Sequence, residues 1–225
     1  MDSADTLFAR LRARCEDDWA AYCEHAFVQG LGDGSLPEAA FRHYLIQDYR
    51  FLVHFSRAWA LSVYKSDRLD EMRAASRVLS AILDHEMGLH VQYCARWGIG
   101  LEEMERAPEA RANMAYTRYV LERGVAGDAL DLQVALAPCT IGYAVIGRRL
   151  AALPGALDAA NPYRDWVEMY SGEAYLESVR ETVRLVDRLA ERRLTPARFE
   201  DLVETFRQAT RLEVAFWDMG LGCES

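Results

Sequence analysis

The chain has 225 residues, a length that suits one globular domain, or at most two, with a substantial core. Its composition, 51% hydrophobic and 27% charged, is ordinary for a soluble protein. The net charge of −9 argues against a nucleic-acid-binding role, because phosphate neutralisation needs a basic face. The five cysteines are an odd number without a CxxC pair, which argues against a disulfide framework and favours a reducing cytoplasm.

Helical periodicity runs through nearly the whole sequence, and alternating β-branched runs are absent. We therefore expect an all-α fold, one domain over residues 1–225 with seven or eight helices. The N-terminus lacks the basic start and apolar run of a signal peptide. We see no apolar run of about 18 residues, so we expect no membrane span.

The predicted helices follow one another between glycine and proline breaks. Ser35, Asn161 and Thr195 are the predicted N-caps of the helices that follow them. The predicted ranges are 3–28, 37–65, 67–97, 108–123, 128–153, 162–193 and 196–220, with a short turn at 102–106.

The apolar stretch from Leu132 to Arg149 centres on a cysteine. Cys139 and Tyr143 are four residues apart and share one face of a helix. Pro138 lies inside the helical pattern and predicts a kink, which would open the helix toward a pocket. The thiol is either a core residue or a nucleophile in that pocket, and the local sequence alone favours the core. The other cysteines are predicted core residues: Cys15, Cys23, Cys94 and Cys223.

Two carboxylates interrupt apolar helix faces. Asp48 lies in the middle of an aromatic stripe within residues 44–59, and Glu213 occupies the centre of a stripe within 206–220. A buried, unpaired carboxylate is costly, so each side chain needs hydrogen-bond donors or a pocket. Apolar walls would raise the pKa of such a carboxyl and make it a usable general acid. For Asp48 a structural hydrogen bond remains as good an explanation as a functional role.

The segment HEMGLH resembles the metal motif HExxH but carries one extra residue. His85 and His90 are five residues apart and do not share a helix face well, and the ExxH spacing of di-iron proteins is missing. We therefore expect no metal and interpret His90 as a structural histidine or one that supports a site residue. Glu86 and His90 are four apart, a spacing that allows them to pair.

Aromatic residues recur at helical spacing elsewhere, at Tyr116 and at Tyr163, Trp166 and Tyr170. Such stripes are more often core than ligand cage. A buried tyrosine hydroxyl needs a partner, however, so several converging tyrosines suit a polar heteroaromatic ligand.

Six segments, in this order, resemble the TenA or thiaminase II family, which has a haem-oxygenase-like all-α fold. The resemblance covers nearly the whole chain. The segments are FRHYLIQDYRFLVHF, HEMGLHVQYCARWGI, NMAYTRYV, LAPCTIGY, NPYRDWVEMYSG and LEVAFWDMG.

The resemblance implies a hydrolase of thiamin salvage that works without a cofactor. Family members bind a 4-amino-2-methylpyrimidine and hydrolyse the bond from its C5 methylene to a leaving group, giving hydroxymethylpyrimidine. The leaving group is ammonia in the aminomethylpyrimidine and the thiazole in thiamin. The resemblance also implies a homotetramer with a small-molecule partner, no nucleic acid and no membrane.

The resemblance assigns roles residue by residue. Cys139 matches the nucleophile that adds to the pyrimidine, Glu213 the acid that protonates a ring nitrogen, and Asp48 the carboxylate that bonds the ring's amino group. Tyrosines that match pocket residues are Tyr116, Tyr143 and Tyr170. Phe51 departs from members that carry a tyrosine there, so any activation of the thiol by that hydroxyl would pass to Tyr143, Glu213 or water.

Two other functions remain open at this point. One is a regulatory role, since the family has carried a transcription-activator label; the pI of about 5.1 and the lack of a basic recognition helix oppose direct DNA contact. The other is a haem-, quinone- or metal-handling relative, because one fold hosts many functions.

Overall fold

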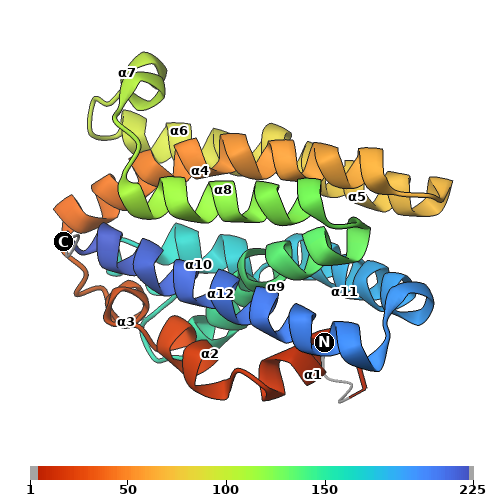
Figure 1. Cartoon of the computed structure of the whole chain (residues 1–225). Coiled ribbons are helices and arrows are strands. Elements are labelled where there is room, and N and C mark those ends of the chain that lie inside the picture. The colour runs from red at the N-terminus through yellow and green to blue at the C-terminus, as the bar shows by residue number, and fades with distance from the viewer. Residues whose placement is uncertain (1–4, 223–225) are drawn as a thin grey trace.

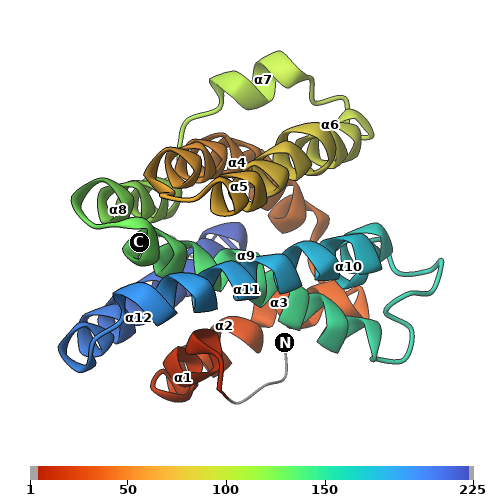
Figure 2. The same ribbon diagram turned by 90° about the vertical axis from the view of Figure 1, so that its right-hand side faces the viewer.

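The structure, a computed structural model, describes residues 5–222 (Figures 1 and 2). These residues form twelve α-helices and one π-helical turn and contain no strand, which confirms the all-α class. The predicted number of helices, seven or eight, is too low. The elements are α1 (Leu7–Ala13), α2 (Glu16–Cys23), α3 (Ala26–Asp33), α4 (Glu38–Lys65), α5 (Leu69–Ala81), η1 (Ile82–Glu86), α6 (Met87–Ala95), α7 (Leu101–Arg106), α8 (Arg111–Ala126), α9 (Ala129–Ala151), α10 (Arg164–Ser171), α11 (Glu173–Arg193) and α12 (Pro196–Gly220).

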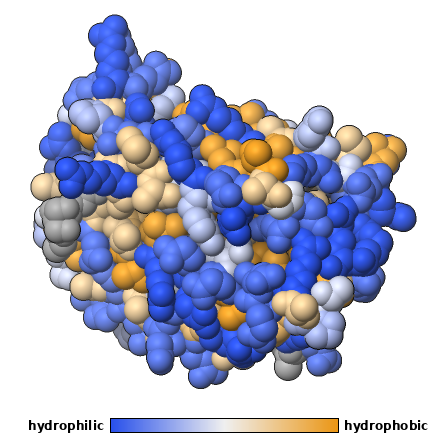
Figure 3. Space-filling view, viewed as in Figure 1, coloured by the Kyte–Doolittle hydropathy of each residue, from blue (hydrophilic) through white to orange (hydrophobic). Residues whose placement is uncertain are grey.

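Helix α9 is the central element of the bundle. It packs against α8, α10, α11 and α12. The helices α4, α5, α6 and α8 form a layer on one side of it, and α1, α2 and α3 lie on the opposite side (Figures 1 and 2). By length and composition α9 is apolar enough to cross a membrane, contrary to our reading of the sequence, but 89% of its most apolar window is buried inside the protein. The face of the molecule in Figure 3 is largely hydrophilic, with separate apolar patches.

The start of α9 is anchored by a reciprocal cap. The Asp128 side chain accepts from the backbone of Leu130 and Asp131, and the Asp131 side chain accepts from the Asp128 N–H. Arg193 of α11 and Arg198 of α12 donate to Asp128 at 2.9 and 2.6 Å. These bonds join the start of α9 to the end of α11 and the start of α12. The cap also confirms the start that the sequence predicted for α9.

The predicted helix over 3–28 is wrong. The described part of this segment folds as α1, α2 and α3, while Ser3 lies outside the described residues. The chain turns at Cys15 and at His25, whose ring accepts from the Phe27 N–H. Each of the three short helices contacts α12. One straight helix over residues 3–28 would be about 39 Å long and could not bend around the bundle to make these contacts.

The predicted helix over 162–193 is also wrong, because Gly172 separates α10 from α11 in an extended conformation. Ser35 and Asn161 are not N-caps: α4 begins after Pro37, and α10 begins after Tyr163. Asn161 instead accepts from the Tyr163 N–H and donates to the Leu31 and Ala156 carbonyls. The predicted cap at Thr195 is confirmed.

The predicted helix over 67–97 is helical in the structure from Leu69 to Ala95, but a π-helical turn, η1, interrupts its middle. A π-turn inserts one residue into the helical ladder and shifts the faces of the helix on either side, and such turns are frequent at functional sites. The turn ends at Glu86. Side chains before and after the turn therefore point in different directions from those that an unbroken α-helix would give them.

Gly147 holds α9 against α10. A methyl group at this position would lie 2.6 Å from the carbonyl carbon of Tyr170 and 2.9 Å from the Ser171 nitrogen, which are backbone atoms that yield only if α10 moves. We expect Gly147→Ala to lower the free energy of unfolding by about 1–3 kcal/mol, measured by urea denaturation. Gly88→Ala is the matched control, because no neighbouring atom lies within 4 Å of the added methyl group; it should stabilise α6 slightly. Equal stabilities of the two variants would contradict the close-packing account.

Candidate active site

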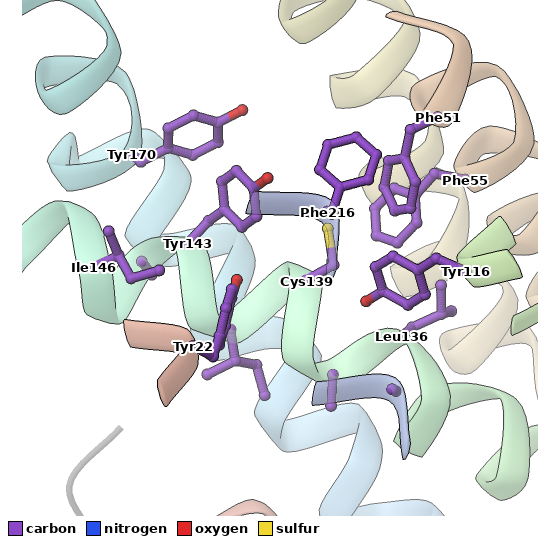
Figure 4. Close-up of a cluster of buried hydrophobic side chains, with 14 of the residues drawn as sticks. Tyr22, Phe51, Phe55, Tyr116, Leu136, Cys139, Tyr143, Ile146, Tyr170 and Phe216 are labelled. Atoms are coloured by element: carbon purple, nitrogen blue, oxygen red, sulfur yellow. The ribbon is translucent and has the colours of Figure 1, made fainter. Parts of the chain in front are cut away.

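Cys139 lies midway along α9 and is 8% exposed. Its sulfur points from the helix toward the ring of Phe216, and the rings of Tyr116 and Phe51 lie beside it (Figure 4). The thiol lies within hydrogen-bonding reach of the Glu213 carboxyl. Burial, reinforced by the nearby negative charge of Glu213, raises the pKa of the Cys139 thiol well above its ordinary value. The thiol is therefore protonated at neutral pH and needs a base when it reacts.

Glu213 of α12 is the nearest candidate for that base. It is 1% exposed, and the Tyr116 hydroxyl donates to its Oε1 at 2.8 Å. Burial raises the pKa of Glu213 to about 8, although the hydrogen bonds from Tyr116 and Cys139 favour the ionised form. A carboxyl with this pKa accepts and returns a proton near neutral pH, which is the property required of a general acid–base.

Asp48 of α4 lies in a second buried polar cluster. Its Oδ2 accepts from the Tyr44 hydroxyl at 3.0 Å and lies 2.5 Å from Nε2 of His90. The Nδ1 atom of His90 lies 2.9 Å from the Glu86 carbonyl oxygen. Since a carbonyl only accepts, Nδ1 carries a hydrogen, and the opposite ring nitrogen, Nε2, faces the Asp48 carboxyl. Burial opposes the charged ring, but the Asp48 carboxylate and Glu86 together outweigh this effect and raise the pKa of His90.

The sequence alone singled out neither Glu86 nor Tyr44 as a site residue. The carboxyl of Glu86 accepts from the Tyr170 hydroxyl at 2.7 Å, and burial raises the pKa of Glu86 to about 7 against the opposing effect of His90. Glu86 and His90 do pair, as their spacing allowed, but through the Glu86 backbone. The interpretation of His90 as a supporting histidine agrees with its bond to Asp48. The HEMGLH segment contains Glu86, but its similarity to a metal motif points to the two histidines instead.

The remaining predicted side chains line these two clusters with aromatic rings. The Tyr143 hydroxyl lies 3.4 Å from that of Tyr44, and the Tyr143 ring meets the Tyr170 ring edge-on at 4.8 Å between centroids. Phe51 packs 5.1 Å from the ring of Tyr116 and 5.4 Å from that of Phe216. The structure thus brings the seven predicted side chains to one region of the core; their chemical roles stay predictions, as does the kink at Pro138.

A cavity of about 650 Å³ reaches this region from between α5, η1, α6, α10 and α11. Cys139, Thr140 and Glu86 lie on its wall, with Phe55 and Tyr175. The buried side chains Asp48, Glu213, Tyr116 and Tyr143 do not line it. Acidic side chains on the outer part of the wall are Asp165, Glu168 and Glu173. The thiol is thus the predicted residue that a ligand entering the cavity would touch.

The other described cysteines, Cys15, Cys23 and Cys94, are buried and unbridged, as expected of core residues, while Cys223 lies outside the described residues. Across residues 5–222, no group of three or more His, Cys, Asp or Glu side chains is arranged to hold a metal ion.

Comparison with known proteins places this geometry in a family. A family model described as "TENA/THI-4/PQQC family" matches residues 12–222. The chain is 40% identical to an uncharacterised protein of Haemophilus influenzae, over 96% of this chain and 99% of that protein. It is 37% identical to an aminopyrimidine aminohydrolase of Halalkalibacterium halodurans, over 94% and 93% of the two chains. A crystal structure described as a TenA family transcription regulator, from Silicibacter sp. TM1040, superposes with a TM-score of 0.91 at 47% identity and covers 96% of each chain. The chain belongs to the TENA/THI-4/PQQC family.

Proposed function

We propose that this protein is an aminopyrimidine aminohydrolase with thiaminase II activity. It converts 4-amino-5-aminomethyl-2-methylpyrimidine into the 5-hydroxymethyl compound and also cleaves thiamin, both in thiamin salvage. One observation carries the proposal: a buried thiol on the cavity wall lies within hydrogen-bonding reach of a carboxyl whose pKa burial raises to about 8. The name of the 37% identical relative supports the same reaction.

The chemistry of the pyrimidine decides where the thiol adds. A leaving group on the C5 methylene departs only when C5 can push electrons toward it, and addition of sulfur at C6 creates that electron-rich carbon. As the Cys139 sulfur bonds to C6, the electron pair of the C6–N1 double bond moves to N1. Glu213 delivers a proton to N1 and takes the thiol proton, so no net charge accumulates on the ring.

The leaving group then departs with the electrons of its bond to the methylene. The C4–C5 double bond moves to C5 and the methylene, and the 4-amino group becomes positively charged as it supplies electrons. Water adds to the methylene, the electrons of the double bond return to the ring and neutralise the 4-amino group, and the released ammonia takes the proton that water loses. The C6–S bond then breaks as N1 returns its proton to the sulfur through Glu213. For the aminomethyl substrate in its ammonium form, water and substrate give the alcohol and an ammonium ion.

Asp48 is the residue we propose for the 4-amino group, where positive charge develops. Its carboxylate is oriented by Tyr44 and His90, so it would stabilise that charge without having to reorient during the reaction. The rings of Tyr143, Tyr170 and Phe51 would hold the pyrimidine in position.

Replacing Asp48 by asparagine should lower kcat for the aminomethylpyrimidine about 100-fold, with a smaller change in KM, because the charge appears in the transition state. Steady-state kinetics of both quantities test this. Asp165→Asn is the matched control, since this carboxylate lies on the cavity wall and pairs with Arg96 at 3.0 Å. An Asp48→Asn effect confined to KM would contradict the role in charge stabilisation.

The proposal includes the setting of the enzyme. Residues 1–225 would form one catalytic domain of haem-oxygenase-like fold that acts in the cytoplasm without a cofactor. We propose a homotetramer, which the exposed apolar side chains Tyr64, Leu69 and Val125 support as contact points.

Parallel steady-state assays of the purified protein on aminomethylpyrimidine and on thiamin test the proposed function, with release of hydroxymethylpyrimidine as the readout. We expect turnover of at least one compound without added metal or cofactor. If neither compound releases hydroxymethylpyrimidine, the proposed function is wrong.

A further inference from the structure

Two polar side chains on the cavity wall have no role in the steps described so far. Thr140 follows the nucleophile in the sequence and is 5% exposed. The residue lies on the cavity wall, and its buried Oγ1 has no hydrogen-bond partner. A threonine inside a helix ordinarily donates to the carbonyl one turn earlier, and a buried hydroxyl without a partner is costly. Thr140 therefore has an unused hydrogen-bonding group on the side of α9 that borders the cavity.

Glu86 is the second of these side chains. Its carboxyl lies on the same wall, and one of its oxygens, Oε1, accepts from the Tyr170 hydroxyl. The turn η1 ends at this residue, and its backbone carbonyl is bound by the His90 ring. Tyr170 and His90 hold the side chain and the backbone of Glu86 from two directions, so the carboxyl is preorganised at the cavity.

The proposed roles of Glu213, Cys139 and Asp48 indicate where the leaving group would lie. Starting from N1, the ring runs through C6 and C5, which carries the reacting methylene, to C4, which carries the amino group. With Glu213 at N1, Cys139 at C6 and Asp48 at the 4-amino group, the C5 substituent falls between the thiol and Asp48. The Glu86 carboxyl interacts electrostatically with both: its charge helps to raise the pKa of the Cys139 thiol, and the Asp48 charge helps to raise the pKa of Glu86. His90 also links the Glu86 backbone to Asp48.

We propose that Glu86 and Thr140 form the binding site for the leaving group, a primary ammonium on the C5 methylene of the substrate. This inference rests on the proposed function and deepens it. An ammonium offers three N–H donors, and the Glu86 carboxylate and the Thr140 hydroxyl both accept. When the C–N bond breaks, the nitrogen keeps the electron pair and leaves as ammonia, so the departure itself needs no proton. The product carries a neutral hydroxyl in the same place and binds this site more weakly.

The test measures binding without turnover. In a Cys139→Ala background, isothermal titration calorimetry at pH 7.5 gives the Kd of aminomethylpyrimidine and of hydroxymethylpyrimidine. Adding Glu86→Gln should weaken binding of the amine about 10–100-fold, as expected for loss of a charged hydrogen bond, and binding of the alcohol less than about threefold. Thr140→Val, which keeps the shape, should weaken binding of the amine about 3–10-fold.

Glu168→Gln is the matched control, a carboxyl on the outer wall of the same cavity that pairs with Arg164 at 3.3 Å. We expect it to change both Kd values less than about threefold. Loss of amine binding in this variant equal to that in Glu86→Gln would mean that general negative charge is responsible, which would overturn the site.

The outcomes separate the two proposals. If the Cys139→Ala protein binds neither compound, the proposed function fails. If it binds both, and Glu86→Gln and Thr140→Val weaken them equally or not at all, the leaving-group site is wrong while the proposed function stands. Thermal unfolding checks each variant, and should Glu86→Gln fail to fold, the ratio of the two Kd values in Thr140→Val decides alone.

Discussion

Replacing Cys139 by alanine is expected to abolish release of hydroxymethylpyrimidine, with kcat lowered on the order of 10³-fold or more. The alanine variant lacks the sulfur that adds to the ring, and no other described thiol lies on the cavity wall. The measurement is single-turnover and steady-state kinetics with aminomethylpyrimidine. Cys139→Ser keeps the shape and a hydrogen bond to Glu213 but supplies a poorer nucleophile, so it should also be severely impaired.

Cys94→Ala is the matched control for loss of a buried thiol. Cys94 is fully buried in α6 and does not lie on the cavity wall. This variant should keep kcat within about twofold while losing on the order of 1 kcal/mol of stability. If Cys139→Ala retained a tenth of the wild-type kcat, addition of the thiol to the pyrimidine would no longer be a tenable mechanism.

Replacing Glu213 by glutamine should make the protein less active and, at alkaline pH, more stable. Without the carboxyl no group delivers the proton to N1, and general acid–base catalysis contributes about 10²–10⁴-fold, so kcat should fall by that factor. Glutamine is nearly isosteric, and its oxygen still accepts from the Tyr116 hydroxyl, so the fold should be preserved.

The stability effect follows from the pKa of Glu213, which burial raises from 4.5 to about 8. Below pH 4.5 the carboxyl is protonated in both the folded and the unfolded chain. Between pH 4.5 and 8 only the unfolded chain loses the proton, so the free energy of unfolding of the wild type falls as the pH rises. The glutamine variant has no such proton, so at pH 8 it should exceed the wild type by about 2 kcal/mol or more.

Urea denaturation of both proteins at pH 5 and pH 8 measures this difference. Glu86 also has a raised pKa and weakens both proteins in the same way, so the comparison isolates Glu213. If the two proteins show the same pH dependence, Glu213 does not titrate as a buried acid, and its assignment as the proton donor fails.

The accuracy of the predicted helices depended on local signals. The helices predicted over 37–65 and 196–220 match α4 and α12 to within a residue, because each has a proline at its start and an apolar stripe along its length, and α12 also has its cap at Thr195. The breaks at Cys15 and Gly172 were missed because helical periodicity continues across both of them. The chain bends at these two residues so that the helices on either side can pack on α9 and α12. Local sequence propensity does not indicate such a bend, because it depends on contacts with distant helices.

The site was predictable only in part. Asp48 and Glu213 stood out because a carboxylate on an apolar stripe needs a partner, and the structure supplies Tyr44 and His90 for one and Tyr116 for the other. Their roles, and that of Cys139, came from the resemblance to a family. Glu86 could not be predicted as a site residue because its partner Tyr170 lies 84 residues away in the sequence.

By itself, the sequence determined the helical class, the burial of α9 and the cost of two carboxylates on apolar faces, because these depend on side-chain type and spacing along a single helix. Only the tertiary structure decided that His90 faces Asp48, that the thiol lies on a cavity wall, and that Thr140, on the same wall as Glu86, has a hydroxyl without a partner. Those properties depend on distances between helices that are far apart in the chain. Burial of side chains between these helices sets the pKa values on which the proposed chemistry relies.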